Sequence, residues 1–556
     1  MKYRREIDGL RALAVMPVIL FHTGFIVISG GFVGVDIFFV ISGFLITTII
    51  INEMECESFS LINFYERRAR RILPALFVVI TCSLFWAWFS IPPDAFKDFG
   101  KSLIAVSFFS SNFLFVLTSA YFDIRSELKP LLHTWSLAVE EQYYLIFPIF
   151  LLYLRLVSKR IIVVILLNII IISIILAEWG SRKYPIISFY LLPTRGFEIL
   201  IGSVLAMIMN INGKNILKNQ IINEYASLSG LILVIYSIFA FDSKTPWPSL
   251  YTLIPTIGAG LIIFFSSEKN LVGNLLANKF LVGTGLISYS AYLWHQPIIA
   301  FSKNRSLSGN EEVNSLLIIT STIILAYFTW QFIEKPFRNI KIISSKFILY
   351  FSIIGTLFFS VTGLLIYKSN GFRNDDGRIP PNIKWFSLSE KLDIIGDLCI
   401  PKPYNQSGIS LCEFGDINSK RNIILYGDSH AQAISEELNK YFLKNNIKGY
   451  KILLNECEVV PEMRLYLNDK TDITDKCLHN FSEMLSFIKI QNAEIIISSR
   501  WTFKVYPIEG HVDQMPTRNS EGGVENETYR EYVSVNKGKI SFASPQNPDS
   551  SWDSIF

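Results

Sequence analysis

LRALAVMPVILFHTGF (residues 10–25) begins a series of apolar runs that occupies the first two thirds of the chain. A helix needs about 20 residues to cross the hydrocarbon of a bilayer. Clear candidates lie near residues 10–28, 32–51, 73–90, 132–154, 161–177, 196–210, 227–241, 250–266, 281–300, 314–332 and 347–367. Residues 371–556 contain no comparable run. The sequence therefore predicts a polytopic α-helical membrane domain followed by a soluble domain.

The composition of the 556 residues agrees with this interpretation, because 51% are hydrophobic and 18% are charged. Soluble domains carry about 25% charged residues. A single soluble enzyme, a disordered chain and a small disulfide scaffold are thereby excluded. The net charge of +4 is too small to indicate nucleic acid, so no nucleic-acid partner is expected.

A twelfth run, residues 103–118, is short and carries Ser107, Ser110, Ser111 and Asn112. Without it, the loops expected in the cytoplasm hold 18 Lys and Arg, and the outer loops hold 10. Cytoplasmic loops carry an excess of Lys and Arg. We therefore expect about eleven spans, with 103–118 re-entrant or on the outer surface. Counting it as a span would place the soluble domain in the cytoplasm.

Four of the six cysteines lie in the soluble part: Cys399, Cys412, Cys457 and Cys477. Extracytoplasmic domains form disulfides, so two bridges are expected if this part lies outside. Proximity in the sequence favours Cys399–Cys412 and Cys457–Cys477. The alternative is four free, buried thiols.

Arg11 and His22 are eleven residues apart in the first apolar run. At about 100° per residue they share one helix face, about 16 Å apart along the axis. Ionisable groups inside a membrane indicate function by default, and a neutral His can act as a general base. A His bonded to a backbone carbonyl between helices is the structural alternative.

Four arginines occur in FYERRARRILPAL (residues 64–76), before the third run. Arg67 and Arg70 share a helix face, as do Arg68 and Arg71. Guanidinium groups match phosphate geometry. The alternatives are a plain positive-inside anchor and a site for anionic membrane lipids.

Further ionisable residues lie in or near the expected spans: Asp36, His133, Glu140, Glu141, Arg195, Glu198, His295 and Glu334. Helix–helix bonding could explain any one of them. Together they indicate a polar interior, which is typical of an active site or a transport path.

In the soluble part, NIILYGDSHAQAISEELNK (residues 422–440) reads as a strand, a turn and a helix. Gly427 permits a tight turn. Ser429 would lie at the helix N-terminus, where backbone N–H groups can stabilise an oxyanion. Further strands are expected at 450–455 and 494–499, and this spacing predicts a parallel α/β sheet.

Six segments in this order resemble the membrane acyltransferase-3 family, in particular its O-antigen O-acetylase-like members: EIDGLRALAVMPVILFH, GGFVGVDIFFVISGFLIT, FYERRARRILPAL, HTWSLAVEEQYYLIFP, SYSAYLWHQP and FIEKPFR. The resemblance covers about residues 1–340. It implies transfer of an acetyl group from cytoplasmic acetyl-CoA to an extracytoplasmic carbohydrate. It further implies that His22 is catalytic and that Arg11 and the arginines of 67–71, above all Arg68 and Arg71, hold the coenzyme A phosphates.

GDSH (residues 427–430) resembles the nucleophile block of SGNH hydrolases, which implies that Ser429 is a nucleophile beside Asp428. The usual late Asp-x-x-His is missing, because Lys476 and Ile508 lie three residues before His479 and His511. The Asn of the third block is not evident either. We therefore expect a shortened domain in which the activity of Ser429 is an open question.

The sequence thus predicts an acyltransferase-3 membrane domain (1–370), a linker (371–420) and an SGNH-like periplasmic domain (421–556). The expected function is O-acetylation of a surface or lipid-linked polysaccharide, in particular the lipopolysaccharide O-antigen, at a bacterial inner membrane. Acetyl-CoA is the expected acetyl donor, with no metal and no permanently bound cofactor. The alternatives are another surface glycan such as peptidoglycan, a transporter or flippase, and a membrane-anchored surface esterase.

Overall fold

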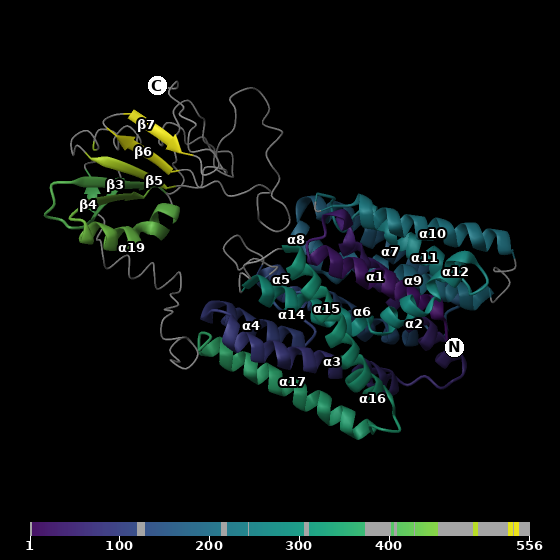
Figure 1. Cartoon of the computed structure of the whole chain (residues 1–556). Helices are drawn as coiled ribbons and strands as arrows, with labels where there is room; N and C mark the ends of the chain where they lie inside the picture. The colour runs from purple at the N-terminus through teal and green to yellow at the C-terminus, as the bar shows by residue number, and fades with distance from the viewer. Residues whose placement is uncertain are drawn as a thin grey trace. The chain divides into compact units, whose positions relative to one another are not determined.

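The computed structural model describes residues 3–118, 128–212, 219–242, 244–304, 311–372, 402–404, 409–427, 429–453, 487, 493–498, 532–536 and 539–543. These residues fall into two compact units (Figure 1). The first consists of helices and lies within residues 3–372, and the second is built on a β-sheet and lies within 402–543. A helical unit followed by a sheet unit agrees with the division expected from hydrophobicity.

The longer helices of the first unit match the apolar runs of the sequence. They are α1 (Arg5–His22), α2 (Gly34–Glu55), α3 (Leu61–Ser90), α4 (Pro93–Ser107), α6 (Thr134–Tyr153), α7 (Lys159–Lys183), α9 (Leu192–Asn212), α10 (Gln220–Ala240), α11 (Leu253–Phe265), α14 (Ser288–Asn304), α15 (Glu311–Thr329) and α17 (Ser345–Lys368). Short helices connect them: α5 (Ser111–Leu117), α8 (Pro185–Tyr190), α12 (Leu271–Leu276), α13 (Lys279–Leu286) and α16 (Lys335–Arg338).

Seven helical stretches among the described residues are long and apolar enough to cross a bilayer. They comprise α2, α3, α7, α8 with α9, α10, α15 with α16, and α17. The expected number of eleven is therefore not confirmed. The four remaining runs correspond to α1, α6, α11 and α14. Of these, α1 carries four charged residues in its first seven positions and α11 has only 13 residues.

The doubtful run at 103–118 does not form one helix. Helix α4 ends at Ser107 and the seven-residue α5 begins at Ser111. Between them Phe109 adopts a φ of 50°, which interrupts the helical backbone. Seven helical residues extend only about 10 Å, so neither half of this run can span a bilayer by itself.

The four arginines of 67–71 lie inside α3, which begins at Leu61, twelve residues before the third apolar run at 73–90. The helix begins at Leu61 because the Ser60 side chain caps it, accepting a hydrogen bond from the Asn63 N–H at 3.4 Å. The basic segment is therefore rigidly helical.

Small residues let helices of this unit approach each other closely. A Cβ atom added to Gly43 of α2 would lie 1.8 Å from the Ile199 carbonyl oxygen of α9. A Cβ atom on Gly202 of α9 would lie 2.0 Å from the Val40 carbonyl oxygen of α2. The reciprocal glycines bring the two backbones into direct contact, and this contact fixes the position of α9 beside α2.

The second unit contains a mixed seven-stranded sheet in the order β1-β2-β4-β3-β5-β6-β7. Its strands are β1 (Lys402–Tyr404), β2 (Ile409–Gly415), β3 (Asn422–Gly427), β4 (Lys448–Leu453), β5 (Glu494–Ser498), β6 (Tyr532–Asn536) and β7 (Lys539–Ala543). The predicted parallel pairing is confirmed, because β3 runs parallel to both β4 and β5. Helix α19 (Ser429–Lys444) follows β3 and packs on the sheet through Ala431 and Phe442.

Two segments of this unit contain strands that were not predicted from the sequence. The expected linker at 371–420 contains β1 and β2, where Cys412 and Phe414 alternate inward with exposed residues. The polar stretch at 517–556 contains β6 and β7, which pair antiparallel beside β5. These strands are too short for an alternation of apolar and polar residues to be recognised in the sequence. They form because they pair with neighbouring strands of the sheet.

Candidate functional site

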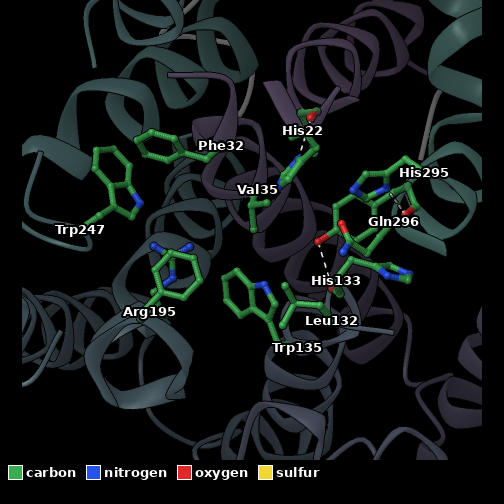
Figure 2. A pocket seen from close by; sticks show the side chains of 13 residues that line it. His22, Phe32, Val35, Leu132, His133, Trp135, Arg195, Trp247, His295 and Gln296 are labelled. Carbon is green, nitrogen blue, oxygen red and sulfur yellow. Dashed lines mark hydrogen bonds between the residues drawn. The ribbon is translucent and has the colours of Figure 1, made fainter. Parts of the chain in front are cut away.

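A small cavity lies between the helices of the first unit (Figure 2). Its volume is about 60 Å³. The lining comes from six α-helices and three connecting segments: Val18, His22, Phe32, Val35, Leu132, His133, Trp135, Phe189, Arg195, Trp247, Tyr292, His295 and Gln296. We call it the histidine cavity, because it collects the three predicted histidines His22, His133 and His295.

The three imidazole rings are neighbours. The ring centroids of His22 and His295 lie 5.4 Å apart, and those of His133 and His295 lie 5.5 Å apart. Figure 2 shows His22 and His295 side by side, with Trp247, Phe32 and Arg195 at the opposite side of the cavity. The sequence predicted a polar interior, and in the structure three of the predicted residues form one compact group of histidines.

Backbone carbonyls fix the orientation of two of these rings. The Nδ1–H of His22 donates to the Val18 carbonyl oxygen at 2.8 Å, and the Nδ1–H of His295 donates to the Tyr292 carbonyl oxygen at 2.5 Å. A carbonyl oxygen can only accept, so each neutral ring carries its hydrogen on Nδ1. The basic nitrogen of each ring is therefore Nε2. The structural alternative expected for His22 was a bond to a backbone carbonyl between helices, whereas the observed bond lies within α1.

Hydrogen bonds of the Tyr292 hydroxyl fix the part of the cavity wall to which His295 belongs. Its hydroxyl donates to the His133 carbonyl oxygen at 3.1 Å and lies 2.6 Å from the Ser136 hydroxyl. These bonds connect α14 to the beginning of α6. The relative positions of His295 and His133 are thus set by hydrogen bonds as well as by packing.

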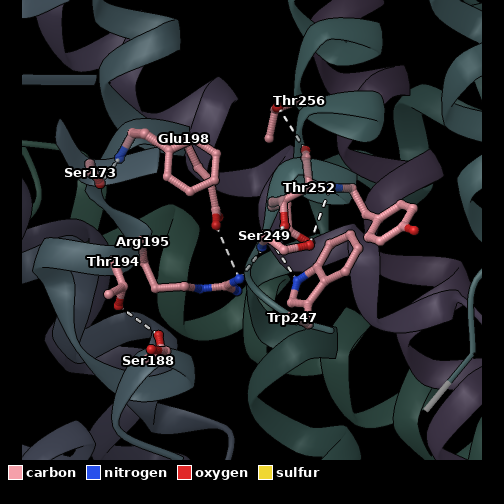
Figure 3. A network of polar contacts seen from close by, with 12 residues as sticks. Ser173, Ser188, Thr194, Arg195, Glu198, Trp247, Ser249, Thr252 and Thr256 are labelled. Atoms are coloured by element: carbon pink, nitrogen blue, oxygen red, sulfur yellow. Dashed lines mark hydrogen bonds and ion pairs between the residues drawn. The ribbon is translucent and has the colours of Figure 1, made fainter. Parts of the chain in front are cut away.

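A buried ion network forms the opposite wall (Figure 3). The Arg195 guanidinium lies 3.0 Å from the Asp36 carboxylate and 3.0 Å from the Glu198 carboxylate. All three side chains are at most 1% exposed. The Trp247 indole N–H donates to Asp36 at 3.3 Å. The predicted Asp36 is therefore not a cavity-lining acid, and it acts on the cavity through Arg195 and Trp247.

Aromatic rings pack around the Arg195 guanidinium, and hydroxyl groups fix the beginning of the helix that carries it. Its guanidinium carbon lies 5.2 Å from the Trp135 ring centroid and 5.5 Å from that of Phe189. Where α9 begins, the Thr194 hydroxyl donates to the Ser188 carbonyl at 2.6 Å (Figure 3). The Ser173 hydroxyl of α7 donates to the Pro193 carbonyl at 2.6 Å. The first turn of α9 is thereby tied to α7 and α8.

Arg11, on the same helix as His22, belongs to a second group of polar residues. It forms an ion pair with Asp8 at 2.8 Å, and Asp8 also accepts a hydrogen bond from the Tyr3 hydroxyl at 2.6 Å. Burial and this bond raise the pKa of Tyr3 to about 12, so the hydroxyl remains a hydrogen-bond donor at neutral pH. We call Arg11, Arg68, Arg71 and Arg338 the arginine cluster.

Electrostatic interactions connect the members of the arginine cluster. Arg71 interacts with Arg11, Arg68 and Arg338. Within the described part of the chain, neither Arg68 nor Arg71 forms an ion pair with a carboxylate. Four like charges held together, two of them without an ion-paired carboxylate among the described residues, favour a polyanionic ligand. The arrangement suits phosphate groups.

The other two arginines of the segment have structural partners. Arg67 forms an ion pair with Glu53 at 2.9 Å. Arg70 is buried, pairs with Glu66 at 2.7 Å and donates to the Ile343 carbonyl at 2.7 Å. These contacts tie α3 to α2 and to the segment after α16. The structure thus separates the two faces of α3, with Arg68 and Arg71 on the cluster side.

The predicted acids Glu140 and Glu141 lie near the arginine cluster and not in the histidine cavity. Glu140 accepts hydrogen bonds from the Ser42 hydroxyl and the Tyr144 hydroxyl, both at 3.0 Å. Glu141 interacts electrostatically with Arg68 and Arg71. Helix α6 therefore contributes to both groups, with His133 just before its first residue and the two acids about two turns on.

The sequence did not single out Arg338, Tyr292 or Trp247. Arg338 pairs with Glu334 at 2.5 Å, and Glu334 also accepts a hydrogen bond from Ser290. A π-helical turn at Trp330–Glu334 precedes this pair. Such turns are frequent at functional sites. The spacing of Glu334 and Arg338, four residues apart, is the only signal in the sequence that could have indicated the pair.

In the second unit, Ser429 is the first residue of α19, two residues after the end of β3 at Gly427. This is the strand–turn–helix position expected for a nucleophile. Asp428, Cys399, Cys457 and Cys477 lie outside the described residues. Cys412 is buried and disulfide-bonded, and its partner lies outside them as well. The second unit therefore contains a disulfide at Cys412, and the pairings Cys399–Cys412 and Cys457–Cys477 stay predictions.

No group of three or more His, Cys, Asp or Glu side chains within the described ranges is arranged to hold a metal ion. The site chemistry described above consists of three imidazoles, one buried guanidinium and a separate group of four arginines. Helix α1 carries members of both groups, with Arg11 near its beginning and His22 at its end.

Comparison with known proteins assigns both units. A family model described as an acyltransferase domain matches residues 4–331. A second one, described as an SGNH domain fused to such domains, matches residues 399–537. No solved structure matches the chain.

Two relatives illustrate the likeness. The chain is 36% identical over 315 residues to the peptidoglycan O-acetyltransferase OatA of Listeria monocytogenes, covering 54% of this chain and 50% of that protein. It is 31% identical over 313 residues to the O-acetyltransferase OatA of Staphylococcus aureus, covering 54% of this chain and 51% of that protein. The chain thus spans about half the length of the curated relatives it matches.

Proposed function

This chain belongs to the acyltransferase family whose domain it carries at residues 4–331, and from that premise we propose that it is an O-acetyltransferase. It would transfer the acetyl group of cytoplasmic acetyl-CoA to a hydroxyl group of a cell-surface glycan. One observation carries the proposal. Helix α1 holds Arg11 in the arginine cluster and His22 in the histidine cavity, about 16 Å apart along its axis.

The arginine cluster fits the acetyl donor. Coenzyme A carries its phosphates at one end and the thioester at the other. Arg68, Arg71, Arg11 and Arg338 would hold the phosphates, with Arg68 and Arg71 contributing charges that no carboxylate pairs in the described chain. Charge-assisted bonds from guanidinium to phosphate are strong and can be bidentate. Membrane lipids with anionic head groups would compete for the same charges.

The histidine cavity fits the acetyl end. A cavity needs roughly 10–15 Å³ to hold one water molecule, and this one has about 60 Å³. It can therefore hold about four to six non-hydrogen atoms by that measure, which suits the methyl, carbonyl and sulfur of an acetyl thioester. The apolar wall of Val18, Val35 and Leu132 suits the methyl group.

The chemistry requires a base and a charge stabiliser. The hydroxyl oxygen of the acceptor forms a bond to the acetyl carbonyl carbon, the carbon–sulfur bond breaks, and the hydroxyl proton passes to the thiolate of coenzyme A. The Nε2 of His22 is the atom that would act, either as base or as a transient acyl carrier. The Arg195 guanidinium lines the cavity and would stabilise the negative charge that develops on the carbonyl oxygen.

The acceptor is a glycan of the cell surface. The expected O-antigen gains no support from the relatives, since the Listeria protein is named for peptidoglycan. We therefore favour peptidoglycan, which was the alternative interpretation of the sequence. The acetyl group reaches it directly or through an ester on Ser429 of the SGNH domain.

The soluble unit would lie on the outer side of a bacterial cytoplasmic membrane, near the glycan. Two features support this orientation. The Lys and Arg excess lies in the loops on the side of Arg11, and Cys412 is disulfide-bonded, which is typical of an oxidising compartment.

The test is the acetyl content of purified surface glycans, measured by proton NMR. A deletion strain would carry the wild-type gene, His22→Ala, Arg160→Ala or an empty vector at matched protein levels. Arg160 is exposed and serves as the control. We expect acetyl groups on peptidoglycan with wild type and Arg160→Ala, and their loss with His22→Ala. Acetyl content that the deletion itself leaves unchanged in every glycan would contradict the proposal and favour a transporter.

A further inference from the structure

Of the three histidines in the cavity, the proposed reaction uses only His22. A second imidazole in the same tautomeric state, that of His295, lies beside it. The two ring centroids lie 5.4 Å apart with an angle of 54° between the planes. Each ring donates Nδ1–H to a backbone carbonyl of its own helix, Val18 for His22 and Tyr292 for His295. Each therefore offers Nε2 as a base.

Two neutral bases this close can share one proton. A single buried imidazole that takes a proton becomes a cation in a mostly apolar cavity, which is costly. When a second imidazole lies beside it, the Nε2–H of the charged ring can donate to the Nε2 of the neutral ring. The pair then disperses one positive charge over two rings, and charge-assisted bonds of this kind are stronger than neutral ones.

The positions of the two rings indicate a different role for His22 and for His295. His22 lies on the helix that carries Arg11, so it is on the path of the thioester in the proposed function. His295 lies on α14 between His22 and His133, which precedes the first residue of α6. Tyr292 fixes His295 through the accepting carbonyl and through its own bonds to Ser136 and His133. Such fixed geometry is what a proton transfer needs.

We propose that His295 is a second catalytic base, which takes the proton of the acceptor hydroxyl while His22 serves the leaving thiolate. The proposal rests on the proposed function. As the oxygen–carbon bond forms, the hydroxyl proton moves to Nε2 of His295. It crosses to Nε2 of His22 as the carbon–sulfur bond breaks, and it ends on the sulfur of coenzyme A. Both rings return to their neutral state, so no further reactant is needed.

His133 does not have the same role. Among the described residues neither of its ring nitrogens has a hydrogen-bond partner, so no such bond fixes its tautomer. Its ring lies 5.5 Å from His295, at 68° to it, and forms part of the cavity wall. The backbone carbonyl of His133 accepts the Tyr292 hydroxyl, so this residue contributes to positioning whatever its side chain is.

The test uses permeabilised cells of the deletion strain, which contain their own glycan acceptor, supplied with radiolabelled acetyl-CoA. His295→Asn keeps an N–H group near the Tyr292 carbonyl and lacks the basic Nε2. His295→Ala leaves a space that added imidazole can enter. Pyrrole, which has the same ring size and no basic nitrogen, is the matched control compound. Acetyl-CoA binding is measured on the purified full chain for each variant.

We expect both variants to bind acetyl-CoA as wild type does and to label glycan about 10²–10⁴-fold more slowly, the usual contribution of general acid–base catalysis. Imidazole should restore His295→Ala in proportion to its concentration, and pyrrole should not. Labelling within about threefold of wild type, far below the loss expected of a base, would overturn the proposal. So would a loss that imidazole does not restore. A wild-type protein that labels no glycan would instead refute the proposed function.

Discussion

The Arg195 guanidinium and the Asp36 carboxylate lie 3.0 Å apart with no appreciable solvent exposure, and the Glu198 carboxylate lies at the same distance from the same guanidinium nitrogen. Two carboxylates therefore depend on one buried cation. Removal of one partner of a buried ion pair leaves an uncompensated charge, which costs about 3–5 kcal/mol.

Arg195→Met should therefore lower stability strongly, because Asp36 and Glu198 lose their shared counter-ion. Thermal unfolding of the detergent-solubilised protein measures the effect. Arg182→Met is the control, since Arg182 pairs with Glu178 at 2.6 Å on the surface and is 61% exposed. Exposed pairs of this kind contribute at most about 1 kcal/mol. Equal unfolding temperatures for the two variants would contradict the role of the buried network.

The two faces of α3 should differ in their effect on the acetyl donor. Arg68→Ala and Arg71→Ala each remove a charge that no described carboxylate pairs, so the KM for acetyl-CoA should rise. A hydrogen bond to a charged group contributes about 1.5–3 kcal/mol, which corresponds to roughly 10–150-fold. Arg338→Ala should have a smaller effect, because Glu334 already pairs with Arg338.

Arg67→Ala is the matched control for this series. It lies one residue before Arg68, carries the same charge and pairs with Glu53. Its KM should stay within about threefold of wild type, as for loss of an exposed ion pair. A similar rise in KM for Arg67→Ala and Arg68→Ala would show that the segment acts only through its total charge.

The volume of the histidine cavity should determine the length of the acyl group. Leu132 lines the cavity with Val18 and Val35, and Leu132→Ala removes three carbon atoms from this wall. Propionyl-CoA should then become a substrate, with the ratio of propionyl to acetyl transfer rising about tenfold, as one methylene group in an apolar pocket is worth about 1–3 kcal/mol. Leu156→Ala, at a position 91% exposed, should leave the ratio unchanged. An unchanged ratio for Leu132→Ala would place the acyl group elsewhere.

The crossing of α2 and α9 should tolerate no side chain at Gly43. A Cβ atom there would lie 1.8 Å from the Ile199 carbonyl oxygen, so the helices would have to separate. Gly43→Ala should lower the unfolding temperature by an amount that corresponds to about 1–3 kcal/mol. Gly283 in α13 is the control, because nothing lies within 4 Å of its Cβ position. Gly283→Ala should be neutral or stabilising by up to about 1 kcal/mol. Destabilisation of both variants to the same extent would contradict the packing argument.

Much of this architecture could be predicted from hydrophobicity, since the apolar runs and the helices of the first unit largely coincide. The exceptions have physical causes. Helix α1 is buried among α2, α13 and α14, so it accommodates Glu6, Asp8 and Arg11 with protein partners in place of lipid. The run at 281–300 is divided at Ile287 into α13 and α14. A hydropathy window detects neither neighbouring helices nor such a break.

The candidate site was only partly predictable. The three histidines were recognisable in the sequence as ionisable residues in or near apolar runs. That they lie together depends on how α1, α6 and α14 pack, which the sequence does not show. Helical spacing paired Arg68 with Arg71 and Arg67 with Arg70. It could not show which pair faces Arg11 and which pair binds Glu53 and Glu66. Arg338 was missed because its partner Glu334 ends a π-helical turn and is held in turn by Ser290 of α14.

Ser429 separates the two routes from the thioester to the glycan. It is the first residue of α19, two residues after the end of β3 at Gly427. If the acetyl group passes through an ester on this residue, Ser429→Ala should abolish glycan acetylation. If Nε2 of His22 is the transient carrier, the membrane unit should still release one coenzyme A thiol per chain and keep the acetyl group on that nitrogen, because His22 and the arginine cluster are untouched. His22→Ala should abolish both. Proton NMR of the glycan and a thiol assay on the purified chain measure the two steps. If Ser429→Ala keeps the wild-type acetyl content, the membrane unit transfers the acetyl group directly and the SGNH domain has another task.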